Sequence, residues 1–129
     1  MSDNPRNKRQ RKKIRDALID FDKLIADYTV LQTNLERIRK DIDHFTEYVK
    51  TRFVNGAYLP LEKSFSISLL KGQANIKHGA SVPDILNFLD LIQDDQKYQL
   101  DQINEYTSKL KSKHKHIQSL KKQWGEESE

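Results

Sequence analysis

The chain contains no cysteine, and only four glycines and three prolines among 129 residues. The first absence excludes disulfides, thiol catalysis and cysteine-ligated zinc. The scarcity of glycine and proline predicts long uninterrupted elements, because these residues interrupt regular structure. No stretch approaches the roughly 20 apolar residues that cross a bilayer. The charged start also lacks the apolar core of a secretory signal. We therefore expect a cytosolic protein, with the nucleus as the alternative.

The composition argues against a thick core. Hydrophobic residues make up 36% of the chain and charged residues 33%, whereas globular domains carry roughly 45–50% and about 25%. Long helices that bury a narrow stripe and expose the rest fit such a balance. The length suits one domain over residues 1–129.

A long amphipathic helix is predicted over residues 5–54. Apolar residues recur there at alternating spacings of three and four, which is the pattern of a coiled-coil seam. Asn55 and Gly56 supply the stop. Leu18 and Ile25 widen the stripe, so that more than one neighbour can pack against it. The predicted seam positions are Ile14, Ala17, Phe21, Leu24, Tyr28, Leu31, Leu35, Ile38, Ile42, Phe45 and Val49.

A second long helix is predicted over residues 82–124. Ser81 and Asp84 form a capping-box pattern before it, Gly125 is the predicted end, and residues 125–129 form an acidic tail. Glutamines and a lysine at three seam positions weaken this stripe. The predicted seam positions are Ile85, Leu89, Ile92, Gln96, Gln99, Ile103, Tyr106, Leu110, Lys113, Ile117, Leu120 and Trp124.

The connector, residues 55–80, has a different pattern. Polar and apolar residues alternate over residues 64–69, which indicates a half-buried strand. Gly72 then offers a turn into a return strand, and Asn55-Gly56 offers a shorter hairpin upstream. A short helix with Leu61, Phe65 and Leu69 on one face is the competing interpretation.

Together these segments predict a mainly α fold. Two long helices fold back on each other as an antiparallel coiled-coil hairpin, and a short connector with β-hairpin strands joins them. The alternative is that each helix pairs with another chain.

Positive charge is concentrated near the two ends of the chain. Antiparallel helices would bring both clusters to one end of the hairpin, which we call the basic tip. Such a surface attracts acidic proteins, nucleic acid or anionic lipid, and the alternative is that it only keeps an exposed end soluble. The predicted partner-binding residues of the basic tip are Arg9, Arg11, Lys12, Lys13, Arg15, Lys109, Lys113, Lys121 and Lys122.

Nothing in the sequence predicts catalysis. His114 and His116 are two residues apart, so on a helix they face different directions and cannot chelate one metal. Asp94 and Asp95 have the pattern of a solvated helix face. No phosphate loop, nucleophile elbow or metal-ligand spacing is present. We therefore expect no enzyme activity, no catalytic residue, no metal and no cofactor.

The order of long helix, β-connector and long helix resembles alpha-type prefoldin subunits. The return strand at residues 73–78 lacks the glycines and aromatic residues of that family, and the link between the hairpins is shorter. The likeness in motifs is carried by Ser66-Ile67-Ser68-Leu69-Leu70-Lys71-Gly72, by Ser81-Val82-Pro83-Asp84-Ile85-Leu86-Asn87-Phe88-Leu89-Asp90 and by Asn55-Gly56-Ala57-Tyr58-Leu59-Pro60.

The resemblance implies a co-chaperone subunit that assembles with other subunits, as a hetero- or homo-oligomer, and holds client proteins with its helix ends. We expect Phe65, Ile67, Leu69 and Ile76 to mediate subunit association. Two other hypotheses stay open. One is a structural coiled-coil adaptor of a trafficking or cytoskeletal complex, using Leu18 and Ile25. The other is a nucleic-acid-binding accessory protein that uses the basic tip, which is not favoured because the tip has too few aromatic residues for base stacking.

Overall fold

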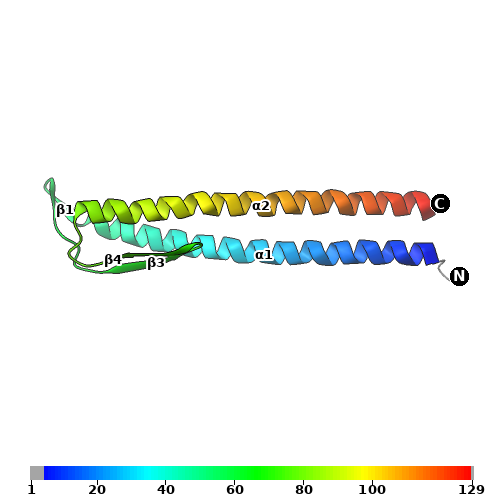
Figure 1. The fold of residues 1–129 in the computed structure, drawn as a ribbon, viewed down its shortest axis with the longest axis horizontal. Coiled ribbons are helices and arrows are strands. Elements are labelled where there is room, and N and C mark those ends of the chain that lie inside the picture. Colours follow the sequence, from blue (N-terminus) through cyan, green and yellow to red (C-terminus); the bar gives the residue numbers. More distant parts are fainter. Residues whose placement is uncertain (1–4, 129) are drawn as a thin grey trace. The chain divides into compact units, whose positions relative to one another are not determined.

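A computed structural model describes residues 5–128 of the chain. It confirms the mainly α fold: two long helices pack against each other, and two small antiparallel β-hairpins connect them (Figure 1). The elements in chain order are α1 (Pro5–Lys50), β1 (Phe53–Val54), β2 (Ala57–Tyr58), β3 (Phe65–Leu69), β4 (Gly72–Ile76) and α2 (Val82–Ser128).

The chain divides into two compact units, and both long helices run through each of them. The terminal unit consists of Met1–Val30 and Ile103–Glu129. The connector unit consists of Leu31–Gln102, which includes both β-hairpins.

In the terminal unit, the start of α1 packs against the end of α2 in antiparallel orientation. Four apolar side chains are buried there, and Phe21 and Trp124 cover them. Further along, the Tyr28 and Tyr106 rings lie 6.1 Å apart. The buried residues are Ile14, Ala17, Ile117 and Leu120.

In the connector unit, a larger core joins the two helices to the hairpins. Phe45 lies at its centre with 1% of its surface exposed. Its ring packs edge-on against Phe88 of α2 at 4.6 Å and Phe65 of β3 at 5.2 Å. Such aromatic pairs add to the hydrophobic gain from burial. The buried residues of this core are Phe45, Leu61, Ile67, Ala74, Ile76, Ala80, Ile85, Phe88 and Ile92.

The strand interpretation of the connector is confirmed. β3 and β4 pair from Phe65 opposite Ile76 to Leu69 opposite Gly72. In the shorter β1–β2 hairpin, Asn55 and Gly56 have φ angles of 53° and 77°. Two successive positive φ angles define a type I′ turn, which asparagine followed by glycine favours.

Two predicted helix boundaries were wrong. α1 ends at Lys50 rather than at residue 54, because the next residues bond back to the helix and residues 53–54 form β1. α2 continues through Gly125 to Ser128, since a glycine weakens a helix without necessarily ending it. Residues 1–4 and 129 of the predicted domain lie outside the described residues.

The seam of α1 lies as the heptad predicts, with all eleven of its positions buried or half-buried. The seam of α2 differs over its first half. Phe88 and Asp95 are buried there, whereas the predicted Leu89 and Gln96 are exposed. The inward frame is therefore displaced by one residue at these two positions, which leaves a second stripe on the surface of α2.

The predicted capping box at the start of α2 forms. The Ser81 backbone N–H donates to the Asp84 carboxylate at 3.0 Å, and the Ser81 hydroxyl donates to it at 2.9 Å. The Asp84 N–H faces the same hydroxyl at 3.4 Å. These hydrogen bonds, the backbone one foremost, hold the pKa of Asp84 below its ordinary value. They fix the point where the connector enters α2.

Candidate protein-interaction site

The β3–β4 hairpin is the candidate site, and its inner face fixes it to the connector unit. Phe65 of β3 contacts the rings of Phe45 and Tyr48 on α1, at 5.2 and 5.1 Å. Ile67 and Ala74 are buried opposite each other in the strand register. The hairpin lies alongside α1 in Figure 1. Its apolar face is therefore already occupied by the chain's own helices.

A buried aspartate of α2 holds the hairpin's turn. Asp95 is 5% exposed, and its carboxylate accepts hydrogen bonds from the backbone N–H groups of Leu70 and Lys71 at 3.2 and 2.9 Å. The Gln99 amide donates to the same carboxylate at 2.6 Å. A buried carboxylate is tolerated when it is hydrogen-bonded in this way. The expectation that Asp95 belongs to a solvated face was wrong.

The outer face of the hairpin is polar but uncharged. Ser66 donates to the side-chain oxygen of Asn75 at 2.6 Å, and Gln73 donates to Ser66. Neither strand contains a charged residue or a proline. Natural edge strands are commonly protected by charges, prolines or bulges. The two strands lack those charges and prolines, in a chain of which one third is charged.

The two edges of the hairpin differ. On the β3 side, the Arg37 guanidinium of α1 donates to the Ser68 carbonyl at 3.1 Å, so this carbonyl points away from β4. In an antiparallel ladder, pairs of opposite residues alternate: the backbone groups of one pair bond to each other, and those of the next pair face outward. The next outward pair is therefore Ser66 with Asn75. The Asn75 backbone N–H and carbonyl thus face outward on the β4 edge.

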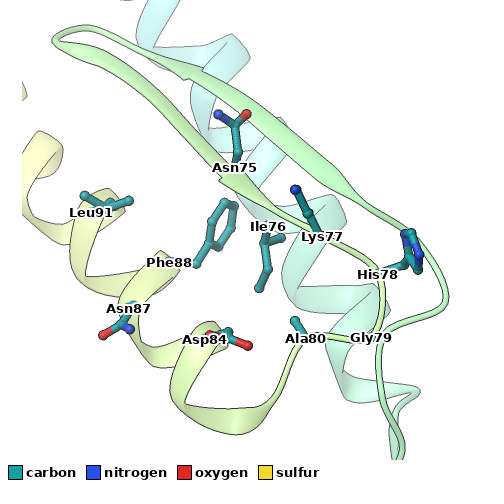
Figure 2. Close-up of a pocket in the computed structure, with 10 residues that line it drawn as sticks. All are labelled: Asn75, Ile76, Lys77, His78, Gly79, Ala80, Asp84, Asn87, Phe88 and Leu91. Carbon is teal, nitrogen blue, oxygen red and sulfur yellow. The ribbon is translucent and has the colours of Figure 1, made fainter.

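A trough lies beside the end of β4. It encloses about 390 Å³ between β4 with the loop after it and the first turns of α2, as Figure 2 shows. Asn75 and Lys77 line one side, and Asn87 and Leu91 line the other. Leu91 is 50% exposed. An extended segment laid along β4 would find outward backbone groups on one side, and on the other the polar Asn87 together with the apolar Leu91.

Of the four side chains predicted to mediate association, Ile76 lines the trough, and all four pack in or against the core. Ile67 and Ile76 are 2% and 5% exposed, and Phe65 and Leu69 pack as half-buried residues against the same core. They hold the hairpin in place and are not available to a partner in this structure. The accessible features are instead the outer polar face and the β4 edge.

The structure brings together parts of both predicted basic clusters in the terminal unit. Arg15 and Lys121 are each exposed and lie one residue from the buried Ile14 and Leu120, which pack in one core. Two other members are engaged within the unit: Lys113 lies 3.4 Å from Asp20, and Lys109 lies 3.0 Å from Glu105. The remaining predicted residues, all exposed, are Arg9, Arg11, Lys12, Lys13 and Lys122.

Apart from Ile76, sequence reasoning missed the residues that shape the trough and hold the turn. Strand alternation places Asn75 on the outer face, but it does not show which edge stays open. Asn87 and Leu91 lie outside the heptad seam and were not predicted as site residues. The inward position of Asp95 could have been predicted, because Asp95 lies three residues after Ile92 and four before Gln99. A seam drawn through Phe88 includes it.

No protein-family model, curated protein or solved structure matches the chain in comparisons with known proteins. Across the part of the chain that the structure describes, neither long helix is apolar enough over a sufficient length to cross a membrane.

Proposed function

We propose that the chain is a non-enzymatic assembly subunit, similar in role to a prefoldin subunit, that holds client proteins. The β4 edge would join subunits, and the exposed helix surfaces of the terminal unit would contact clients. The resemblance of the sequence to alpha-type prefoldin chains supports this role, and the confirmed fold is compatible with it.

The observation that carries the proposal is the unprotected β4 edge beside the trough. Adding a strand to such an edge satisfies backbone groups that otherwise face water, and side-chain pockets next to the edge give selectivity. The hairpin is fixed by Phe45 and Asp95, so little conformational freedom is lost when a strand docks. A preorganised edge binds more tightly for that reason.

Assembly would also explain how weak client contacts become useful. One pair of helix ends offers a small surface, and several copies joined through the β4 edge would bind one unfolded client at several points. Linked sites gain affinity without any new type of contact. Client holding should therefore depend on assembly as well as on the helix surfaces.

The experiment measures light scattering as a chemically unfolded client protein is diluted into buffer with and without this chain. Wild type should suppress client aggregation. Asn75→Pro removes an outward N–H without breaking a backbone hydrogen bond inside the hairpin, although it also removes the side-chain bond with Ser66. We expect it to need roughly tenfold more protein for equal suppression.

Asn75→Thr is the matched control, because threonine keeps the N–H, favours strands and can bond with Ser66. It should behave as wild type. Far-UV circular dichroism should show equal helix content in all three proteins. Equal suppression by Asn75→Pro and wild type would contradict the proposal.

A second candidate function rests on the exposed basic residues of the terminal unit. If they bind nucleic acid, affinity for a single-stranded oligonucleotide should fall steeply with added salt, since neutralised phosphates release counterions. Client holding through apolar contact should change much less over the same salt range.

A further inference from the structure

The first half of α2 carries a second heptad stripe on its surface. Its inward seam runs through Ile85, Phe88, Ile92, Asp95 and Gln99, all buried or half-buried. The second stripe repeats the four–three spacing on the adjacent face, and its apolar members are 39–57% exposed. This outer stripe consists of Val82, Leu86, Leu89, Gln93, Gln96 and Leu100.

This spacing fits a helical partner. Residues at alternating spacings of three and four stay in line along a helix, and they pack as knobs into the holes of a facing helix. A hollow of about 380 Å³ borders the outer stripe at Gln96 and is walled by Ile38 and Ile42 of α1. A helix lying on the stripe would cover this hollow as well.

We propose that the outer stripe pairs with the same stripe of a second copy, in antiparallel orientation. Of the registers open to two such stripes, we choose the one that pairs glutamine with glutamine, and it pairs four of the six stripe residues. When Gln93 faces Gln96 of the second copy, Leu89 faces Leu100 and the two glutamine layers lie at the centre. Paired amides can hydrogen-bond to each other, and buried polar layers are known to fix the register of coiled coils.

The charges beside the stripe match this register. Asp90 and Lys97 directly follow Leu89 and Gln96 on the flank away from α1. In the antiparallel register, Asp90 of each copy lies next to Lys97 of the other, which forms two ion pairs. In a parallel pair, each flanking charge would face an inward seam position of the other copy: Asp90 would face Ile85, and Lys97 would face Ile92. The charges therefore favour the antiparallel arrangement.

This interface goes beyond the β4 edge and does not depend on it. A two-fold pair is closed, because the same surface is used by both copies. A chain with both interfaces could form dimers through α2 and larger assemblies through β4. The two interfaces are separable by substitution.

The test measures dimerisation of charge-reversal variants by sedimentation equilibrium. The variants are made both in the wild-type protein and in Asn75→Pro, which is expected not to assemble through the β4 edge. Asp90→Lys sets lysine against Lys97, and Lys97→Asp sets aspartate against Asp90. Each single variant should weaken dimerisation roughly tenfold. The double variant Asp90→Lys/Lys97→Asp restores opposite charges and should recover the wild-type dimer.

Leu89→Gln/Leu100→Gln tests the apolar layers and should abolish the dimer. Ile19→Gln is its control: Ile19 is 59% exposed on α1, outside the outer stripe, and its replacement should leave the dimer intact. Three results would overturn self-pairing: a double charge variant as weak as the singles, a Leu89→Gln/Leu100→Gln variant that stays dimeric, or an Asn75→Pro protein that is monomeric at millimolar concentration. The last result would leave the stripe for a helix of another protein. If the charge variants behave as expected but Asn75→Pro has no effect on assembly, the proposed function is rejected and self-pairing through the outer stripe stands.

Discussion

Asp95 is a single side chain that bonds the turn of the proposed interaction hairpin to α2. Its carboxylate accepts hydrogen bonds from two backbone N–H groups in the turn of the β3–β4 hairpin and from the side-chain amide of Gln99. Backbone groups at such a turn would otherwise bond to water. The aspartate thus connects α2 to the hairpin that α1 supports from the other side.

Replacing Asp95 with alanine should lower the free energy of unfolding by about 2 kcal/mol, since hydrogen bonds to a charged group are lost. Amide hydrogen exchange at Leu70 and Lys71 should accelerate more than exchange in α1. Asp94→Ala is the matched control, because Asp94 is exposed next to it. Equal effects of the two substitutions would contradict the role assigned to Asp95.

Asp84 gives stability a predictable dependence on pH. Its pKa is lowered in the folded state, first by the Ser81 backbone N–H and then by the Ser81 hydroxyl. A carboxyl group whose pKa is lower in the folded state than in the unfolded state stabilises the fold at a pH above its unfolded-state pKa. This stabilisation is lost as the pH falls through the folded-state pKa. Chemical denaturation from neutral pH down to about pH 3, near the ordinary range of a carboxyl, should show a smaller decline for Asp84→Asn than for wild type. An identical decline would show that the capping box makes no such contribution.

At the scale of elements, the β3–β4 hairpin has one face in the core and one outer edge open. Its inner face shares a core with both helices through Phe45. The same alternation that buries Ile67 exposes Ser66 and Ser68. Two strands alone are at best marginally stable in water. The hairpin persists because its inner face packs in the shared core.

Phe45→Ala should destabilise the connector unit by roughly 3–5 kcal/mol, the usual cost of removing a buried aromatic ring. Thermal unfolding followed by near-UV circular dichroism would measure the loss. Phe53→Ala is the control, since Phe53 is 52% exposed and its truncation should cost less than about 1 kcal/mol. Similar losses from both variants would contradict the central position of Phe45.

The sequence predicts most of the elements because each has a local cause. The heptad of α1 and the strand alternation at residues 64–69 are periodic, and Asn55-Gly56 determines its own turn. The frame of α2 could not be predicted as well, because two stripes lie side by side there and Leu89 competes with Phe88. Burial of Phe88 depends on Phe45 and the hairpin, which are distant in the chain. For the same reason, the alternation predicted the hairpin but not which of its edges stays open.

At the scale of the whole molecule, the connector unit carries two surfaces suited to assembly, the β4 edge and the outer stripe of α2. The terminal unit carries exposed basic residues from both helices. This division of features suits a subunit that assembles through one part and contacts partners through another. The same division explains why charge is abundant in the chain but absent from β3 and β4, the strands of the proposed assembly surface.

The most direct test of the central claim is the mass of the protein in solution, measured by light scattering coupled to size exclusion. Wild type and Asn75→Thr should form the same assembly, and Asn75→Pro should form a smaller species with unchanged helix content. If all three proteins have the same mass at every concentration, the β4 edge does not join subunits and the account is wrong.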